Sequence, residues 1–392
     1  MTTEKIILQD LVKVFGEHPE KALSLLHEGF GKEEILAKTG QTVGVNKVSF
    51  TVQEGETFVL MGLSGSGKST VLRCINRLIR PTEGKVLIDG ENITTIAATR
   101  LCEIRRKKLG MVFQRFALFP HRTVLDNVAY GLEIQGINKE LRYSKARELL
   151  EVIDLKNWAN AYPGQLSGGM QQRVGLARAL VSDPDILLMD EAFSALDPLI
   201  RREMQNELLS LQSKLNKTII FVTHDLDEAL KIGDRIALMK DGSIIQIGTP
   251  EEILTKPADE YVERFIEGVD RTKVLTAEGI MKDAETISLK DGPRVALRKM
   301  REMGISSIFV LNRERKLVGL VTADTAWQAK EDKDTELSKI MLTDFPTAAP
   351  DTPLIELIPL LAETKFPVAI VNEEEKLLGI VVRGTLLAAL AN

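Results

Sequence analysis

The sequence predicts an α/β fold for the first two thirds of the chain and a smaller α+β domain for the remainder. Short apolar runs alternate with helical patterns up to about residue 270. Two of these runs, ILLM at 186–189 and IIFV at 219–222, are apolar throughout, which is typical of strands buried on both faces of a parallel sheet. The remaining residues repeat themselves at a constant offset of 60 positions. We therefore expect a parallel sheet covered by helices, followed by a duplicated unit.

The overall composition is that of an ordinary globular protein. Hydrophobic residues make up 44% and charged residues 27% of the 392 positions, which excludes a fibrous or unfolded chain. Lys and Arg number 51 against 56 Asp and Glu, a formal net charge of -5. No general basic field is present to attract a polyanion, so nucleic acid is not expected as a partner.

Cysteine content and the N-terminus both indicate a cytosolic chain. Cys74 and Cys102 stand far apart, so neither a disulfide framework nor a zinc set is expected. The first ten residues carry acidic side chains and no apolar signal region. No window approaches the ~18 consecutive apolar residues of a spanning helix. If the protein works at a membrane, another chain must supply the membrane part.

The expected elements of the first domain follow one another at short intervals. Asp241 and Gly242 separate two apolar runs and predict a tight antiparallel hairpin. Residues 17–43 interrupt the first strand pair with two short helical patterns, broken at Gly29 and Gly31, and predict a helical hairpin. The strands are expected at 48–52, 57–62, 85–90, 110–114, 185–190, 218–225 and 235–242.

The C-terminal repeat needs no gap. Met281 corresponds to Met341, and the runs at 308–311 and 317–321 correspond to those at 368–371 and 377–381. Each copy is expected to run helix, strand, charged turn, strand, helix. A unit this small must pack on its twin to bury its sheet. Residues 274–392 are therefore expected to form one pseudo-symmetric domain, with copies at about 274–330 and 335–392.

The strongest motif is a glycine-rich loop between an expected strand and an expected helix. Residues 62–69, GLSGSGKS, match the pattern G-x-x-x-x-G-K-[ST]. Backbone N–H groups of such a loop surround phosphate oxygens, Lys68 neutralises the β- and γ-phosphate charge, and Ser69 offers a hydroxyl to Mg²⁺. The alternative is a glycine-rich turn with a surface lysine. The expected phosphate-binding residues are Gly62, Leu63, Ser64, Gly65, Ser66, Gly67, Lys68, Ser69 and Thr70.

Two acidic residues close a later apolar strand. Asp190 is expected to hold Mg²⁺, and Glu191 to act as the general base toward the attacking water. Adjacent carboxylates after a strand can also cap the next helix, and alone they favour that interpretation. Together with the glycine-rich loop they predict a catalytic pair.

A third motif, LSGGMQQR at 166–173, closely resembles the signature sequence of ABC-type ATPases and lies in the family's order between the other two. Ser167, Gly168 and Gly169 open a helix whose N–H groups form a second anion site. The resemblance implies a P-loop ABC-type ATPase that binds ATP and Mg²⁺. It also implies that this motif completes the nucleotide pocket of a second copy of the chain, so that two ATP molecules lie between two copies.

Further roles follow from this resemblance position by position. Gln114 corresponds to the residue that meets Mg²⁺ and the attacking water, Asp197 to the loop residue that couples the two sites, and His224 to the switch histidine near the γ-phosphate. A lone histidine after a strand is otherwise more often structural. Phe15 is the expected adenine-stacking residue, with a core aromatic as the alternative because the insertion after it disturbs the usual spacing.

Three further features make the resemblance more specific, and this resemblance covers essentially the full length of the chain. They are the insertion at 17–43, the variant EAFSALD at 191–197, and the C-terminal repeat, which is similar to a tandem CBS domain. The chain resembles the ATP-binding subunit of bacterial glycine betaine/proline betaine importers. This implies an ABC ATPase domain at 1–270 with a helical subdomain at about 115–180, and a tandem CBS domain at 274–392.

The family also implies partners and a place in the cell. These are a transmembrane permease and an extracellular solute-binding protein or domain, with the chain at the cytoplasmic face of the membrane, energising uptake of compatible solutes in osmotic stress. An importer of choline, carnitine, proline or an amino acid stays open, as does a non-transport ABC ATPase. In the CBS copies, Asp324 follows Thr322 by only two positions, and GIVVRGT in the second copy lacks both residues of the usual ribose-binding pair. A cyclic dinucleotide and a purely structural role both remain open.

Overall fold

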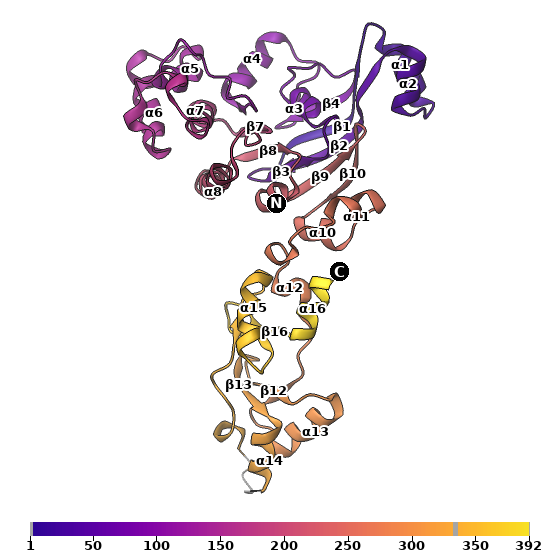
Figure 1. Cartoon of the computed structure of the whole chain (residues 1–392), viewed down its shortest axis with the longest axis vertical. Coiled ribbons are helices and arrows are strands. Elements are labelled where there is room, and N and C mark those ends of the chain that lie inside the picture. The colour runs from indigo at the N-terminus through magenta and orange to yellow at the C-terminus, as the bar shows by residue number, and fades with distance from the viewer. Residues whose placement is uncertain (1–2, 332–335, 392) are drawn as a thin grey trace. The chain divides into compact units, whose positions relative to one another are not determined.

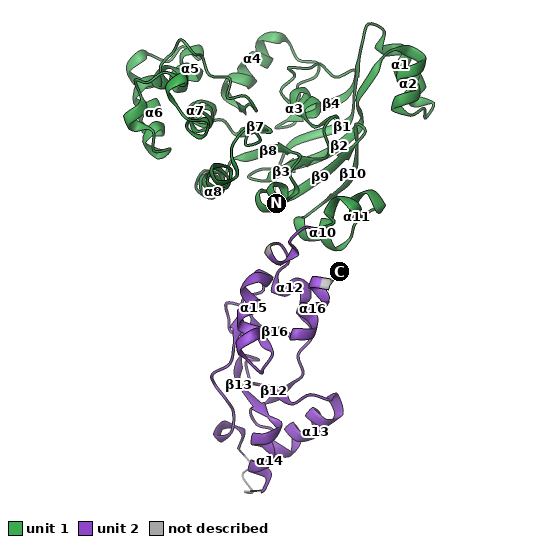
Figure 2. Cartoon of the chain, in the orientation of Figure 1, with its two compact units in different colours: residues 1–267 green, residues 268–392 purple. Residues whose placement is uncertain are grey.

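The computed structural model describes residues 3–331 and 336–391, so the expected domain limits 1, 335 and 392 lie outside the described residues. The chain divides into two compact units, Met1–Glu267 and Gly268–Asn392 (Figure 2). The first unit combines sheets and helices in alternation (Figure 1), which confirms the expected α/β class. Each unit is described by itself below.

The central sheet of the first unit has the strand order β10-β9-β3-β8-β7-β6. Neighbours from β9 to β6 pair in parallel, and β10 is antiparallel to β9 across the turn at Asp241 and Gly242, as expected. Every residue of β3, β7 and β8 is buried, which explains why the runs at 58–61, 186–189 and 219–222 are apolar throughout. The strands are β3 (Thr57–Met61), β6 (Leu109–Val112), β7 (Ile186–Asp190), β8 (Thr218–Thr223), β9 (Arg235–Lys240) and β10 (Ser243–Gly248).

A second, antiparallel sheet has the order β2-β1-β4-β5. Its strands are β1 (Glu4–Phe15), β2 (Thr42–Gln53), β4 (Glu83–Ile88) and β5 (Glu91–Asn92). Side chains from both sheets form one core, in which the rings of Phe50 and Phe58 stack at 4.7 Å. Residues 17–43 contain α1 (Pro19–His27) and α2 (Lys32–Thr39), and Phe15 still pairs with Thr42 across the interruption. The two strands therefore stay paired up to the insertion, with bulges that shift the register at several points along β1.

A helical region follows β6 and has a hydrophobic core of its own. Figure 1 shows its helices grouped together at one side of the first unit. The elements are α5 (Val124–Ile134), α6 (Lys139–Val152), η1 (Lys156–Trp158), η2 (Pro163–Gln165) and α7 (Gly168–Leu180). The other helices of the unit are α3 (Lys68–Ile75), α4 (Ala98–Lys107), α8 (Pro198–Leu215), α9 (Leu226–Ile232), α10 (Pro250–Thr255) and α11 (Glu260–Ile266).

The second unit contains two copies of one motif, with the sheets β11-β12-β13 and β14-β15-β16. In each copy a helix, a strand, a charged turn, a strand and a helix follow in the expected order. The elements are η3 (Arg271–Lys273), α12 (Ala277–Ile280), β11 (Thr286–Ser288), α13 (Pro293–Met303), β12 (Ser307–Leu311), β13 (Leu317–Thr322), α14 (Ala323–Glu331), η4 (Leu337–Lys339), β14 (Thr347–Ala348), α15 (Leu354–Glu363), β15 (Val368–Val371), β16 (Leu377–Val381) and α16 (Arg383–Ala391).

The two copies exchange their leading segments. Lys282 of the first copy forms a β-bridge with Ile380 of the second, and Leu342 of the second bridges to Leu320 of the first. Met281 and Met341 lie against Gly379 and Gly319, where an added Cβ would meet the methionine sulfur at 2.9 and 2.8 Å. Each sheet is thus completed by chain from the other copy, and glycine is required at both crossing points because a side chain there would displace the methionine.

Candidate nucleotide-binding and catalytic site

The glycine-rich loop connects β3 to α3 at the carboxyl end of the parallel sheet. Gly62 and Gly67 have φ angles of +146° and +101°. A Cβ at Gly62 would lie 2.2 Å from the Met239 carbonyl oxygen, and one at Gly67 would lie 2.5 Å from that of Gly44. Both the conformation and the close approach of the backbone therefore require glycine. The loop brings backbone N–H groups together at the start of α3, an arrangement suited to binding phosphate oxygens.

Lys68 is buried at the first position of α3. Its Nζ donates hydrogen bonds to the carbonyl oxygens of Gly62 at 2.8 Å and Leu63 at 2.9 Å. Burial lowers the pKa of the Lys68 ammonium, although the charges of Glu191 and Asp190 act in the opposite direction. The loop thus holds a desolvated positive charge, which an anionic phosphate would stabilise.

Asp190 is the last residue of β7, and its carboxylate is suited to be a Mg²⁺ ligand. Its Oδ2 lies 3.1 Å from Nη2 of Arg73, while its Oδ1 is buried without a hydrogen-bond partner. Ser69 lies in the first turn of α3 and is partly exposed. A hydroxyl and a carboxylate are oxygen ligands of the kind that Mg²⁺ prefers. The described residues contain no cluster of three or more His, Cys, Asp or Glu suited to a metal, so such an ion would take its other ligands from phosphate and water.

One oxygen atom of the Glu191 carboxylate is approached by side chains from two other loops, those of Gln114 and His224. Glu191 Oε2 lies 3.2 Å from Nε2 of Gln114 and 3.5 Å from Nδ1 of His224. Glu191 has a φ of +47°, an uncommon conformation for a residue with a side chain. Its backbone N–H donates to Val222 at 3.0 Å, and the Ser194 hydroxyl donates to its carbonyl oxygen at 2.9 Å. The arrangement can hold a water molecule and accept its proton.

The signature residues lie at the start of α7. Ser167 is the N-cap, with its Oγ accepting from the backbone N–H of Met170 at 3.3 Å. A Cβ added at Gly168 would meet the side chains of Phe116 and Leu196. A Cβ added at Gly169 would meet the side chain of Ile200. Asp197 caps α8 by accepting from the N–H of Ile200 at 3.1 Å. These contacts are with α7, α8 and neighbouring loops of the same chain and not with the glycine-rich loop.

Phe15 lies at the end of β1 with 39% of its surface exposed. Its ring contacts the Gly44 position, where an added Cβ would meet Cε2 at 2.6 Å, and the Lys13 ammonium lies 5.1 Å from the ring centroid. Gly44 in turn contacts Gly67 of the glycine-rich loop. The structure therefore brings Phe15 to the neighbourhood of the loop despite the insertion that follows it.

Some residues at the site were not identified from the sequence. Arg73 contacts Asp190 from α3, and the Ser194 hydroxyl lies 3.3 Å from Nε2 of Gln114. The β9–β10 turn also supports the loop, because the N–H of Gly242 donates to the Ser66 carbonyl at 3.1 Å. The sequence carried only one usable signal for these residues, namely that Ser194 belongs to the EAFSALD variant.

The matches to family models fall within the two compact units of the chain. The ABC transporter model matches residues 45–194, and the CBS domain model matches residues 277–325 and 337–392. The first match contains the glycine-rich loop, the signature and the Asp190–Glu191 pair.

Curated relatives match over nearly the whole chain. Glycine betaine transport ATP-binding protein OpuAA of Bacillus subtilis is 57% identical, with 99% of this chain and 92% of the relative covered. Glycine betaine/carnitine transport ATP-binding protein GbuA of Listeria monocytogenes is 56% identical, covering 99% of this chain and 98% of the relative. Glycine betaine/proline betaine transport system ATP-binding protein ProV of Escherichia coli is 50% identical, covering 98% and 97%.

A solved structure resembles the ATPase unit. The ATP-binding cassette MJ0796, described as a dimer in a post-hydrolysis state with ADP and Pi, has a TM-score of 0.53 and 35% identity, covering 62% of this chain and 98% of that one. Among the described residues, no helix has the length and apolarity needed to cross a bilayer. The loop, the acidic pair, the signature and these full-length relatives lead to one assignment: the chain belongs to the ATP-binding subunits of glycine betaine/proline betaine ABC transporters and is an ABC ATPase with a C-terminal tandem CBS domain.

Proposed function

We propose that this chain hydrolyses ATP to power the import of glycine betaine, or a related compatible solute, through a partner permease during osmotic stress. The convergence of Gln114, Glu191 and His224 on one carboxylate oxygen, beside the glycine-rich loop, supports this proposal most directly. The loop and Lys68 bind the triphosphate, and Ser69 and Asp190 would hold Mg²⁺, which would neutralise phosphate charge. Glu191 takes a proton from the attacking water as the bond from the γ-phosphorus to its bridging oxygen breaks.

The proposed working form is a dimer of ATPase subunits. Ser167, Gly168 and Gly169 supply N–H groups and a hydroxyl at a helix start, which is a suitable site for the phosphates bound by the other copy. The MJ0796 structures, which are described as dimeric, support this arrangement. ATP drives closure because it binds the closed pair more tightly than the open one. A permease and a solute-binding protein or domain outside the cell complete the transporter, with this chain at the cytoplasmic face.

The identities of the relatives favour glycine betaine over other solutes. Three relatives named for glycine betaine are 57%, 56% and 50% identical, a trimethylamine N-oxide relative is 48% identical, and the choline protein OpuBA and the glycine betaine/carnitine/choline protein OpuCA of Bacillus subtilis are 40% and 39% identical. The ATPase subunit does not contact the solute, so this preference has to be measured on the assembled transporter. Choline, carnitine and proline are the competing solutes to include.

Transport is tested in membrane vesicles that carry this chain and its permease, with ATP inside. We expect uptake of labelled glycine betaine that requires ATP, increases after a step in internal ionic strength, and is lost in Glu191→Gln. The exposed Glu54 in the β2–β3 turn provides a matched control, since Glu54→Gln removes the same charge away from the site. ATP hydrolysis without uptake of glycine betaine would contradict the solute assignment, and uptake of a competing solute would replace it.

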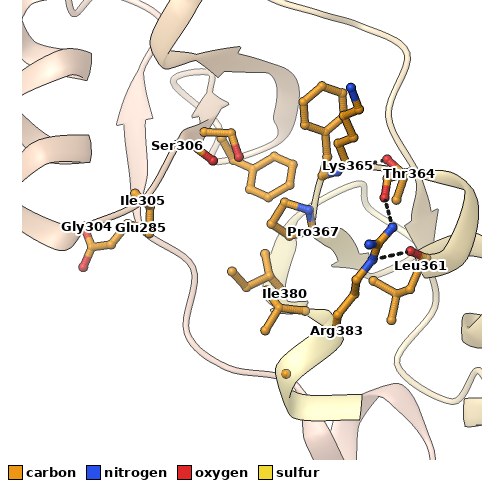
Figure 3. A pocket seen from close by; sticks show the side chains of 15 residues that line it. Glu285, Gly304, Ile305, Ser306, Leu361, Thr364, Lys365, Pro367, Ile380 and Arg383 are labelled. Carbon is orange, nitrogen blue, oxygen red and sulfur yellow. Dashed lines mark hydrogen bonds between the residues drawn. The ribbon is translucent and has the colours of Figure 1, made fainter. Parts of the chain in front are cut away.

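We also propose that the CBS unit binds a regulatory nucleotide. A cavity of about 550 Å³ lies between the two copies (Figure 3), with Lys365, Arg383 and Phe366 among its lining residues. Arg383 is held in place by the carbonyl oxygens of Leu361 and Thr364, both at 2.8 Å. A Lys, an Arg and an aromatic ring suit a phosphate and a base. The Thr325 and Thr385 hydroxyls accept from the N–H groups of Thr322 and Val382 at the starts of α14 and α16, and Glu285 is the carboxylate among the residues that line the cavity.

Calorimetric titration of the full chain with a cyclic dinucleotide, AMP and ATP tests this site. We expect the cyclic dinucleotide to bind, and Lys365→Gln to weaken binding by about tenfold through loss of one charged contact. Lys290→Gln is the control, because Lys290 is exposed in the same unit and does not line the cavity. Absence of binding by any of these nucleotides would contradict the proposal and favour a structural role for the unit.

A further inference from the structure

Helix α8 carries an arginine that links two loops of the catalytic site. One loop, residues 191–197, begins with Glu191 and ends at the α8 cap Asp197. The other follows β8 and contains His224 and Asp225. The side chains of Glu191 and His224 approach to 3.5 Å, although their loops are separate in the sequence. The two loops follow the paired strands β7 and β8, and the Glu191 N–H donates to the Val222 carbonyl, so further contacts are needed only to set how the two side chains face each other.

Arg201 makes those contacts with a single guanidinium group. Its Nε donates to the Phe193 carbonyl at 3.2 Å, and its Nη2 donates to the carbonyls of Ser194 at 3.3 Å and Leu196 at 3.2 Å. Its Nη1 pairs with Oδ2 of Asp225 at 3.4 Å. Three acceptors belong to the loop of Glu191 and one to the loop of His224. The planar fork of an arginine can serve this number of acceptors, whereas a lysine ammonium cannot reach them with the same geometry.

One turn later on α8, Gln205 fixes the second loop independently. Its Nε2 donates to Oε1 of the buried Glu228 at 3.2 Å, and Glu228 accepts a hydrogen bond from the Thr223 hydroxyl. The same Thr223 hydroxyl accepts from the N–H of Asp225 at 3.0 Å. The residues on both sides of His224 are thus held from α8. Helix α8 is therefore a common frame for the two loops.

The backbone of Glu191 shows why such a frame is needed. A φ of +47° is unfavourable for a residue with a Cβ and persists only where surrounding contacts enforce it. The Arg201 contacts with Phe193, Ser194 and Leu196 restrain the loop that leaves Glu191 in this conformation. If they were lost, the loop could relax and move the carboxylate away from His224 and Gln114.

We propose that Arg201 is a positioning residue for ATP hydrolysis, holding the loop of Glu191 against the loop of His224. This inference rests on the proposed roles of Glu191 and His224 and assigns a further residue to the same reaction. Arg201 contacts neither of their side chains in these hydrogen bonds, and its effect passes through Phe193, Ser194, Leu196 and Asp225. A displacement of about 1 Å in such a site can cost on the order of 100-fold in rate.

The test compares Arg201→Lys and Arg201→Gln with Arg202→Gln in the full-length protein. Arg202 is the next residue of α8 and is exposed, so its replacement removes the same charge from the same helix. For both Arg201 variants we expect kcat to fall by about 10- to 100-fold, with KM and the Kd for ATP changed by no more than about twofold. Arg202→Gln is expected to retain the parent values. An unchanged kcat in the Arg201 variants would overturn the proposal.

A loss of folded protein is distinguished by two further measurements. The rate is expressed per ATP-binding protein, determined by titration with a fluorescent ATP analogue, so that unfolded molecules do not count. Asp225→Asn removes the ionic acceptor of Arg201 while keeping an oxygen that can cap α9. This variant is expected to lower kcat by about threefold, less than loss of Arg201, at unchanged Kd. A loss of total activity that disappears once the rate is expressed per ATP-binding protein would overturn the proposal.

Failure of the underlying catalytic assignment gives a different result. His224→Ala is measured alone and combined with Arg201→Gln. If His224 acts as proposed, its single variant loses activity, and adding Arg201→Gln costs much less than it does in the parent, because the loop being positioned no longer carries the imidazole. Full activity in His224→Ala would contradict the proposed catalytic roles. Fully additive losses would overturn the positioning role of Arg201 alone.

Discussion

Replacement of Glu191 by Gln is expected to slow ATP hydrolysis by about 1000-fold while ATP binding is retained, since a positioned general base typically contributes 10²–10⁴ in rate. The amide keeps the size and one oxygen of the carboxylate, and the residue can still accept from Gln114 at the position now 3.2 Å away. It cannot accept the proton of the attacking water. Asp190 and Lys68 are unchanged, so the proposed ligands of Mg²⁺ and the phosphates are kept. The variant should accumulate as an ATP-bound dimer.

Phosphate release and size-exclusion chromatography with ATP measure both parts of this expectation. Glu54→Gln is the control, because it removes an exposed carboxylate outside the site. We expect the control to hydrolyse ATP at the parent rate and to show no persistent dimer. Turnover near the parent rate in Glu191→Gln would mean that another group accepts the proton, and His224 would then be the next candidate for that role.

Lys68→Met is expected to weaken ATP binding by about 100-fold. Hydrogen bonds to charged groups contribute about 1.5–3 kcal/mol each, which corresponds to roughly 10- to 150-fold in affinity. The methionine has a similar length and fills the same buried space next to Gly62 and Leu63. A fluorescent nucleotide titration measures the affinity. An exposed lysine on β4 provides the control, and Lys85→Met should bind ATP as the parent does.

The same variant is expected to keep or raise the melting temperature without nucleotide. Because burial makes the pKa of Lys68 lower in the folded chain than its usual 10.5, the charged form is less favourable in the fold than in the unfolded chain. At neutral pH this charge therefore opposes folding, and the effect disappears only when the pH rises above the unfolded value. A melting temperature well below that of the parent would show that Lys68 supports the loop itself, through the Gly62 and Leu63 carbonyls.

The sequence predicted those parts of the site that are local in the chain. The glycine-rich loop, the Asp190–Glu191 pair and the serine that caps α7 are each encoded within a few residues, and the apolar runs indicated which strands are buried. Strand types could be predicted for the same reason, since burial on both faces leaves no room for alternation.

Contacts between distant segments could not be predicted in this way. Arg73 and Asp190 are 117 residues apart, and Arg201 and Asp225 are 24 residues apart with a strand between them. An arginine on a helix is more often solvated than buried against carbonyl oxygens, so its residue type alone gave no reason to select Arg201. The repeat predicted two matching copies, but the sequence held no sign that Met281 and Met341 would cross to the opposite copy.

That crossing makes the CBS unit indivisible. The N–H and carbonyl groups of Leu320 pair with Leu342, and those of Ile380 pair with Lys282, so each copy closes a strand edge of the other. A chain that ended between the copies would leave the backbone N–H and carbonyl groups of Leu320 unpaired and Gly319 exposed to solvent. Such an unpaired strand edge promotes aggregation. A truncated form of this chain should therefore keep both copies or end before the first of them.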